Sequence, residues 1–144
     1  MLRFIVPSLL ALGFTAATSV AQTYSVQPGQ WDWQADGILA GAPMPFEGSD
    51  CLPSGDAELD FDQLVAEAEQ NSCTLERGAI VGNQTPFTLS CDDGEFVFSA
   101  KGTVNVEREK VVLKADGFLQ VEGLGEVPAS VEATAVNTGQ CPAP

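Results

Sequence analysis

Hydrophobic and polar residues alternate along much of this chain, which is the pattern of strands with one buried face. In "GQWDWQAD", Trp31, Trp33 and Ala35 alternate with polar side chains. In "EFVFSAKGTVNV", Phe96, Phe98 and every second residue after them share one face. These two segments therefore predict β-strands.

Two further segments repeat the alternation. "EREK" predicts an exposed turn, after which "VVLKADGFLQV" returns antiparallel, and "PASVEATAV" supplies a final strand. Gly117 in the first of these predicts a β-bulge. Pro43 and Pro45 predict a loop over residues 41–48, which either contacts a partner or folds over the end of a barrel.

One segment has helical spacing. In "DFDQLVAEAEQ", the apolar residues three or four positions apart are Phe61, Leu64, Val65 and Ala68. Asp60 stands at the N-cap position, and Gln63, three residues later, is expected to complete a capping box. We therefore expect one amphipathic helix in a mainly β domain, whose antiparallel strands form a sheet, a small barrel or a sandwich.

Two of the four cysteines flank a predicted hairpin over residues 73–91. With Gly82 and Asn83 in the turn, Cys73 faces Cys91, which places the two thiols within reach of a disulfide. The same register sets Leu75 against Leu89 and Arg77 against Phe87. Pro86 cannot donate to a ladder, so the hairpin lies at a sheet edge or carries a bulge.

The two remaining cysteines, Cys51 and Cys141, then pair by exclusion. The rival pattern joins Cys51 to Cys73 and Cys91 to Cys141, and spacing alone leaves it open.

The first 21 residues have the composition of a secretory signal peptide. Arg3 precedes an uncharged apolar run, and the small residues Ser19 and Ala21 form a cleavage site before Gln22. Gln22 is not cysteine, so no lipid anchor is expected. We therefore expect a signal peptide over 1–21, a single disulfide-bonded domain over 22–144, and a periplasmic or secreted location.

The charge balance narrows the range of partners. Residues 22–144 carry 5 basic and 20 acidic side chains, a net charge of −15. Such a surface repels the phosphates of nucleic acids and anionic lipids, so we expect neither as a partner. No membrane anchor is expected after cleavage, because the apolar run is short and Pro7 interrupts it. The acidic residues are scattered along the chain, which indicates a solubilising role.

Residues that carry chemistry are few. The chain has no histidine, which excludes Ser-His-Asp and Cys-His catalysis and every histidine metal site. The acid-rich stretches 55–62 and 91–95 lack calcium-loop spacing and are better explained as a helix N-terminus and a turn. We expect no catalytic residue, no metal site and no cofactor.

The best candidates for a binding surface are aromatic: Trp31, Trp33, Phe96 and Phe98. Tryptophans two positions apart on a strand point to one face. They either pack in the core or line a cavity for an apolar molecule, and burial of both rings is expected in either case.

Four short motifs occur together in this chain: "PGQW", "CLP" after a Met-Pro-Phe segment, the central cysteine pair and a terminal "GQC". In this set the chain resembles a family of small exported proteobacterial proteins classed as a domain of unknown function. The resemblance runs from about Pro28 to Cys141. It implies export and an intact disulfide pattern, and it implies no catalytic residue.

Three functional classes remain. The favoured one is a non-catalytic exported protein that binds a small apolar ligand or an envelope partner. The alternatives are a structural or stress-related envelope component and, with less support, a carboxylate-dependent hydrolase.

Overall fold

The computed structural model describes residues 23–144, so the predicted signal peptide lies outside the described residues. Its elements, in chain order, are β1 (Thr23–Ser25), β2 (Gly29–Leu39), β3 (Ala42–Leu52), the 3-10 turn η1 (Ser54–Asp56), β4 (Glu58–Asp60), α1 (Phe61–Gln70), β5 (Cys73–Arg77), β6 (Gln84–Asp92), β7 (Val97–Val106), β8 (Lys110–Val121) and β9 (Gly125–Gly139). No helix within this range is long and apolar enough to span a membrane.

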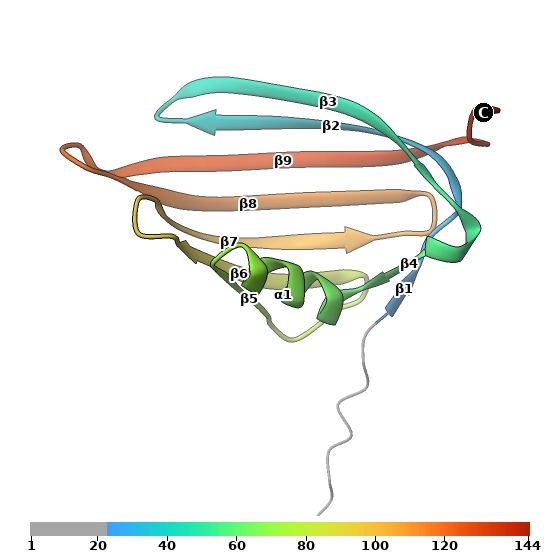
Figure 1. Ribbon diagram of the computed structural model, residues 1–144, viewed down its shortest axis with the longest axis horizontal. Coiled ribbons are helices and arrows are strands. Elements are labelled where there is room, and N and C mark those ends of the chain that lie inside the picture. Colours follow the sequence, from blue (N-terminus) through green and yellow to red (C-terminus); the bar gives the residue numbers. More distant parts are fainter. Residues whose placement is uncertain (1–22) are drawn as a thin grey trace, which may run out of the picture.

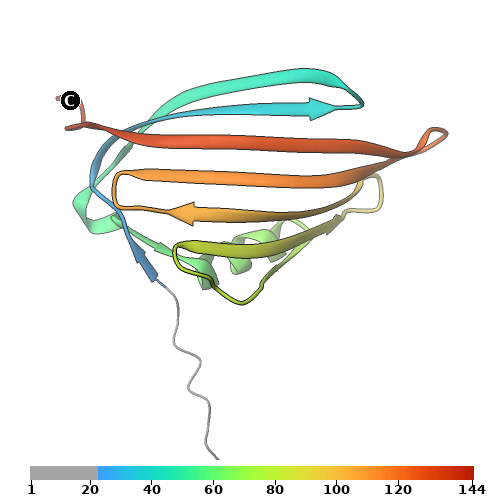
Figure 2. The ribbon, with the colours of Figure 1, turned by 180° about the vertical axis from the view of Figure 1, so that it is seen from behind.

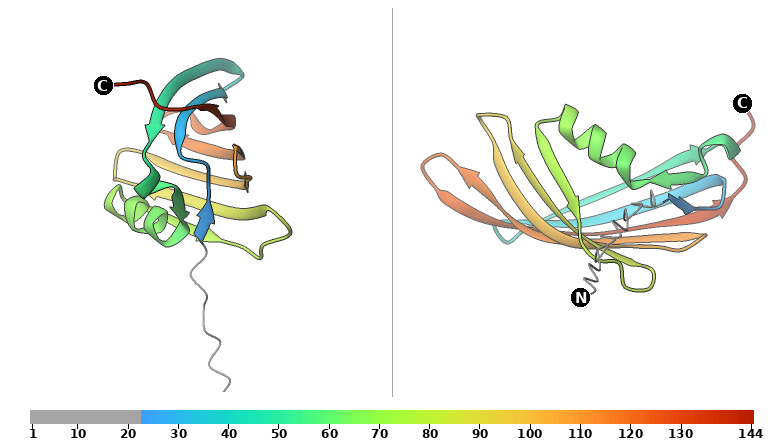
Figure 3. Two further views of the ribbon diagram at one scale, coloured as in Figure 1. Left: turned by 90° about the vertical axis from the view of Figure 1, so that its right-hand side faces the viewer. Right: turned by 90° about the horizontal axis from the view of Figure 1, so that it is seen from below.

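Seven strands form one antiparallel sheet in the order β3-β2-β9-β8-β7-β6-β5 (Figure 1). The sheet is open, with β3 and β5 as its edges. It curves strongly, and α1, β1 and β4 lie on its concave side (Figure 3). Seen from the other side, α1 lies behind the strands (Figure 2). The predicted mainly β fold with one helix is confirmed.

The strand register places the apolar residues of neighbouring strands on the same face. Trp33 pairs with Ala135, Ala135 with Val111, and Val111 with Val106. The neighbouring residues along β8 and β9, Val112 and Thr134, pair with each other, and their side chains point to the convex face. Because side chains alternate with period two, this register gives an apolar concave face and a mostly polar convex one.

The small sheet of β1 and β4 covers one end of the concave face. Val26, Trp31 and Val106 form the buried centre of this packing. Around it, Tyr24 from β1 hydrogen-bonds to the hydroxyl of Thr85, which is fully buried on β6. We call this end, defined by these five residues, the covered end of the concave face.

Helix α1 packs against edge strand β5. Phe61 is buried, and the guanidinium carbon of Arg77 lies 5.8 Å from the centre of its ring. Asp60 caps the helix as predicted, because its Oδ1 accepts the backbone N–H of Asp62 at 2.9 Å. The predicted capping box is wrong: the Gln63 amide donates instead to Glu67, one helical turn ahead, at 3.4 Å.

The predicted loop over 41–48 is also wrong, because this segment belongs to edge strand β3. Pro43 pairs with Ile38 and Pro45 with Asp36. The two prolines are two residues apart, so their missing N–H groups lie on the same side of the strand. An edge strand has one side without a ladder partner, and proline is tolerated there.

The predicted bulge at Gly117 is not formed. Gly117 pairs in register with Ala100 on one side and with Ala129 on the other. A Cβ atom at this position would lie 2.0 Å from the carbonyl oxygen of Ser99. Glycine is therefore required by the close approach of neighbouring strands.

Both predicted disulfides are present: Cys73 is bonded to Cys91, and Cys51 to Cys141. The hairpin register is also as predicted, and the hairpin forms the β5 edge of the sheet. The second disulfide joins the end of β3 to the chain just after β9.

The two disulfides should differ in their contribution to stability. They span 18 and 90 residues. Constraint of the unfolded chain predicts that replacing Cys73 and Cys91 by Ala costs about 3 kcal/mol, and replacing Cys51 and Cys141 about 4.6 kcal/mol. Urea unfolding of the two double variants measures the difference. An equal or reversed order would contradict the assignment of the longer loop as the stronger constraint.

Candidate functional site

The concave face is apolar well beyond its covered end. Phe46 on β3 is 51% exposed and Met44 is also exposed. Towards the middle of the sheet, Leu113, Leu119 and Val131 on β8 and β9 are only half-buried. We call these five residues the open part of the concave face. Exposed apolar surface makes this face a candidate binding site.

A pocket of about 280 Å³ lies at the covered end of this face. Its lining is almost entirely apolar and comes from both sheets: Val26, Trp31, Asp50, Cys51, Leu52, Leu59, Val111 and Ala135. The volume is at the lower end of the range for small-molecule sites, which suits one narrow chain or ring.

Trp31 forms a wall of this pocket and is only 7% exposed. Its Nε1 donates a hydrogen bond of 2.8 Å to the backbone carbonyl of Gln27. The polar atom of the indole is therefore satisfied by the protein, and the carbon atoms of the ring supply apolar contact. The predicted burial of Trp31 is confirmed.

Trp33 differs from its neighbour, because it is 36% exposed. Its ring lies against Gly48 of β3, where a Cβ atom would come within 2.5 Å of it. Its Nε1 donates to Asp50 Oδ2 at 3.0 Å. The predicted burial of both rings is thus wrong for Trp33, because the small sheet covers only the end of the face that holds Trp31.

The two phenylalanines lie at the opposite end of the sheet from the tryptophans. Phe98 pairs with Leu119, eight residues along β7 and β8 from the pair of Val106 and Val111, and Phe96 precedes the start of β7. Their rings stack with centroids 6.3 Å apart. The four aromatic residues therefore share a sheet but do not form one site.

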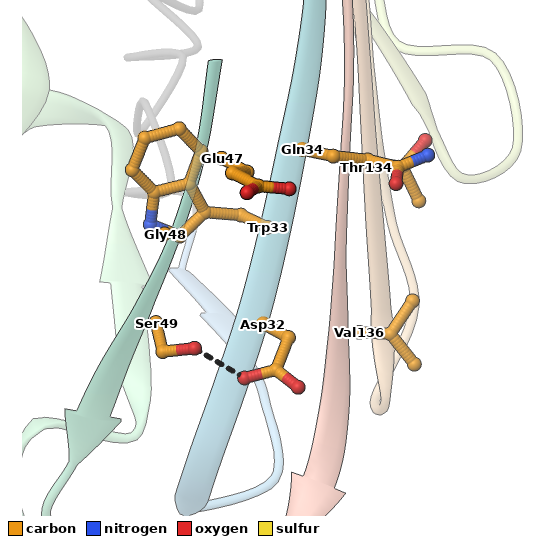
Figure 4. Close-up of a pocket in the computed structure, with 8 residues that line it drawn as sticks. All are labelled: Asp32, Trp33, Gln34, Glu47, Gly48, Ser49, Thr134 and Val136. Atoms are coloured by element: carbon orange, nitrogen blue, oxygen red, sulfur yellow. Dashed lines mark hydrogen bonds between the residues drawn. The ribbon is translucent and has the colours of Figure 1, made fainter.

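A second hollow, of about 640 Å³, is polar and lies where β2, β3 and β9 adjoin (Figure 4). Asp32 and Glu47 both line it, and Ser49 donates a hydrogen bond of 2.6 Å to Asp32. Thr134 and Val136 of β9 border it on the other side. Two carboxylates in one hollow could in principle serve as a general acid and a general base.

The acid-rich stretches have structural roles. Asp92 Oδ1 accepts the backbone N–H of Gly94, and Asp93 Oδ1 accepts those of Glu95 and Phe96. These bonds close the turn between β6 and β7. Within residues 23–144 no three acidic, cysteine or histidine side chains gather as metal ligands would.

Several residues that line the apolar pocket were not predicted from the sequence. Val26 directly follows β1, and Leu59 lies in β4. Both strands have three residues and are too short to show a periodic pattern. Asp50 lies on β3, and the first part of this strand was predicted as a loop because of its prolines. Its two-residue alternation with Gly48 and Phe46 is the signal that would have placed all three on the concave face.

Comparisons of this chain with protein-family models, with curated proteins and with solved structures find no match. The resemblance to a family of exported proteins therefore stays a prediction.

The position of Trp33 depends on the absence of a side chain at residue 48. In Gly48→Ala, the added methyl group should displace the ring, break its bond to Asp50 and lower stability by about 1 kcal/mol. Tryptophan emission should shift to the red, and quenching by acrylamide should increase. Gly55→Ala is the control, because nothing lies within 4 Å of a Cβ atom there. An unchanged emission spectrum in Gly48→Ala would show that the ring does not rest on this strand.

Proposed function

We propose that this protein is an exported, non-catalytic binding protein for a small apolar molecule, which it holds on the concave face of its sheet. The observation that carries the proposal is the apolar pocket beside Trp31, continuous in strand register with an apolar face that no element covers among the described residues. A molecule with an apolar chain fits this arrangement, with its chain in the pocket and its remaining atoms towards the adjoining open part.

Burial of the chain supplies the binding free energy. Each methylene transferred from water contributes about 0.8 kcal/mol. Affinity should therefore increase about fourfold for each added methylene until the pocket and the adjoining face are filled. The same burial covers protein surface such as Phe46, which is half exposed without a ligand.

Export is the part of the proposal that rests on the cysteines and the N-terminal segment. All four cysteines are paired, and disulfides persist in oxidising compartments. Together with the signal-like residues 1–21, this supports a periplasmic or secreted location.

The two alternatives have less support. A purely structural envelope component needs no exposed apolar surface, and a closed interior would have favoured it. A carboxylate-dependent hydrolase would use Asp32 and Glu47, yet the hydroxyl of Ser49 already engages Asp32 and the hollow is open to water.

A titration tests the proposal directly. In Trp33→Phe, the buried Trp31 is the single tryptophan and reports on the pocket. Titration with 1-octanol and 1-decanol should give saturable changes in emission, and the longer chain should bind about 15-fold more tightly. Ala135→Leu should fill the pocket and weaken binding about tenfold.

The matched control is Thr134→Leu, which adds an apolar side chain at the next residue but on the convex face. It should bind both alcohols as the parent does. No saturable change with either alcohol, or equal effects of the two leucine variants, would contradict the proposal. An envelope protein as occupant would then be the better reading of the open face.

A further inference from the structure

Asp50 is the one residue with an ionisable side chain among those described as lining the apolar pocket. It pairs with Trp31 across β2 and β3, and it is exposed at the rim. Its Oδ2 accepts the Trp33 Nε1–H, which fixes the carboxylate beside the half-exposed indole. Within residues 23–144, its Oδ1 has no hydrogen-bond partner from the protein.

We propose that the ligand is a single-chain amphiphile with a cationic head group. The chain enters the pocket along Trp31, and the head group lies between Asp50 and the face of Trp33. This proposal rests on the proposed function, because it assigns the charge of a molecule whose chain occupies that site.

The chemistry of the rim favours a cation. A carboxylate and an aromatic face together recognise ammonium and quaternary ammonium groups, the carboxylate by charge and the ring by its quadrupole. Trp33 is held for this contact, since its Nε1 is bonded to Asp50 and its ring rests on Gly48.

The protein's own cations are placed elsewhere. Lys101, Lys110 and Lys114 lie at convex positions of β7 and β8, and Lys114 pairs with Glu132 at 3.1 Å. Arg108 donates to the Gln27 side chain at 3.0 Å and does not line the pocket.

An anionic head group would meet repulsion at this rim. Arg77 stacks on Phe61 beneath α1, at edge strand β5, so it cannot neutralise a ligand held at β3. With 20 acidic and 5 basic side chains after residue 21, the field of the whole protein also attracts cations and repels anions.

The test uses the full exported protein at pH 7.5. It compares three probes with ten-carbon chains: decyltrimethylammonium, 1-decanol and decanoate. Isothermal titration calorimetry should show that the cation binds most tightly, at least about tenfold more tightly than decanoate. The affinity for 1-decanol should lie between the two. Asp50→Asn keeps an oxygen for the Trp33 hydrogen bond and removes the charge. It should weaken binding of the cation about fivefold to tenfold and leave 1-decanol unchanged.

Asp32→Asn is the matched control, because it removes the same charge from the opposite face of the neighbouring strand. It should change none of the three affinities by more than about twofold at physiological salt. Equal losses in the two variants, or decanoate binding as tightly as the cation, would overturn the head-group assignment. Failure of 1-decanol to bind would instead overturn the proposed apolar site, and failure of all three probes would overturn both.

Discussion

The whole molecule depends on one constraint: the register of seven antiparallel strands keeps their apolar positions on the same face of the sheet. A row such as Trp33, Ala135, Val111 and Val106 runs straight across four strands. A slip of one residue in any strand would turn its apolar side chains to water. This alignment makes one face of the curved sheet apolar, and within residues 23–144 the elements on that face are α1, β1 and β4. They cover one end and one edge, and the proposed ligand would occupy the rest of the apolar face.

Other features protect this arrangement. Long edge strands invite pairing with other chains, and β3 carries two prolines together with Glu47 and Asp50, which oppose such pairing. The disulfide from Cys51 to Cys141 ties the same strand to the end of β9. The convex face carries charged side chains such as Asp32, Glu47 and Lys114, and surface charge opposes association of folded proteins. Charged and apolar side chains are thus largely divided between the two faces of a single sheet.

The sequence predicts an element well where two independent signals agree. In the hairpin over 73–91, the turn residues and the cysteine pair require the same register, and the structure has it. A single proline or glycine signal is less specific: the prolines predict a loop where β3 lies, and Gly117 predicts a bulge where the strands pair in register. The apolar pocket could not be predicted from the sequence for a different reason. It forms where strands of three residues meet the large sheet, and such contacts between distant segments leave no periodic pattern in the chain.

The central claim is that the concave face, and only that face, binds an apolar chain. Methyl resonances test it most directly, because neighbouring residues of one strand report on opposite faces. During titration with 1-decanol, the methyl signals of Val111 and Ala135 should shift with a common saturation curve, and those of Val112 and Val136 should stay in place. Shifts of the convex-face methyl groups, or of both sets equally, would contradict the account.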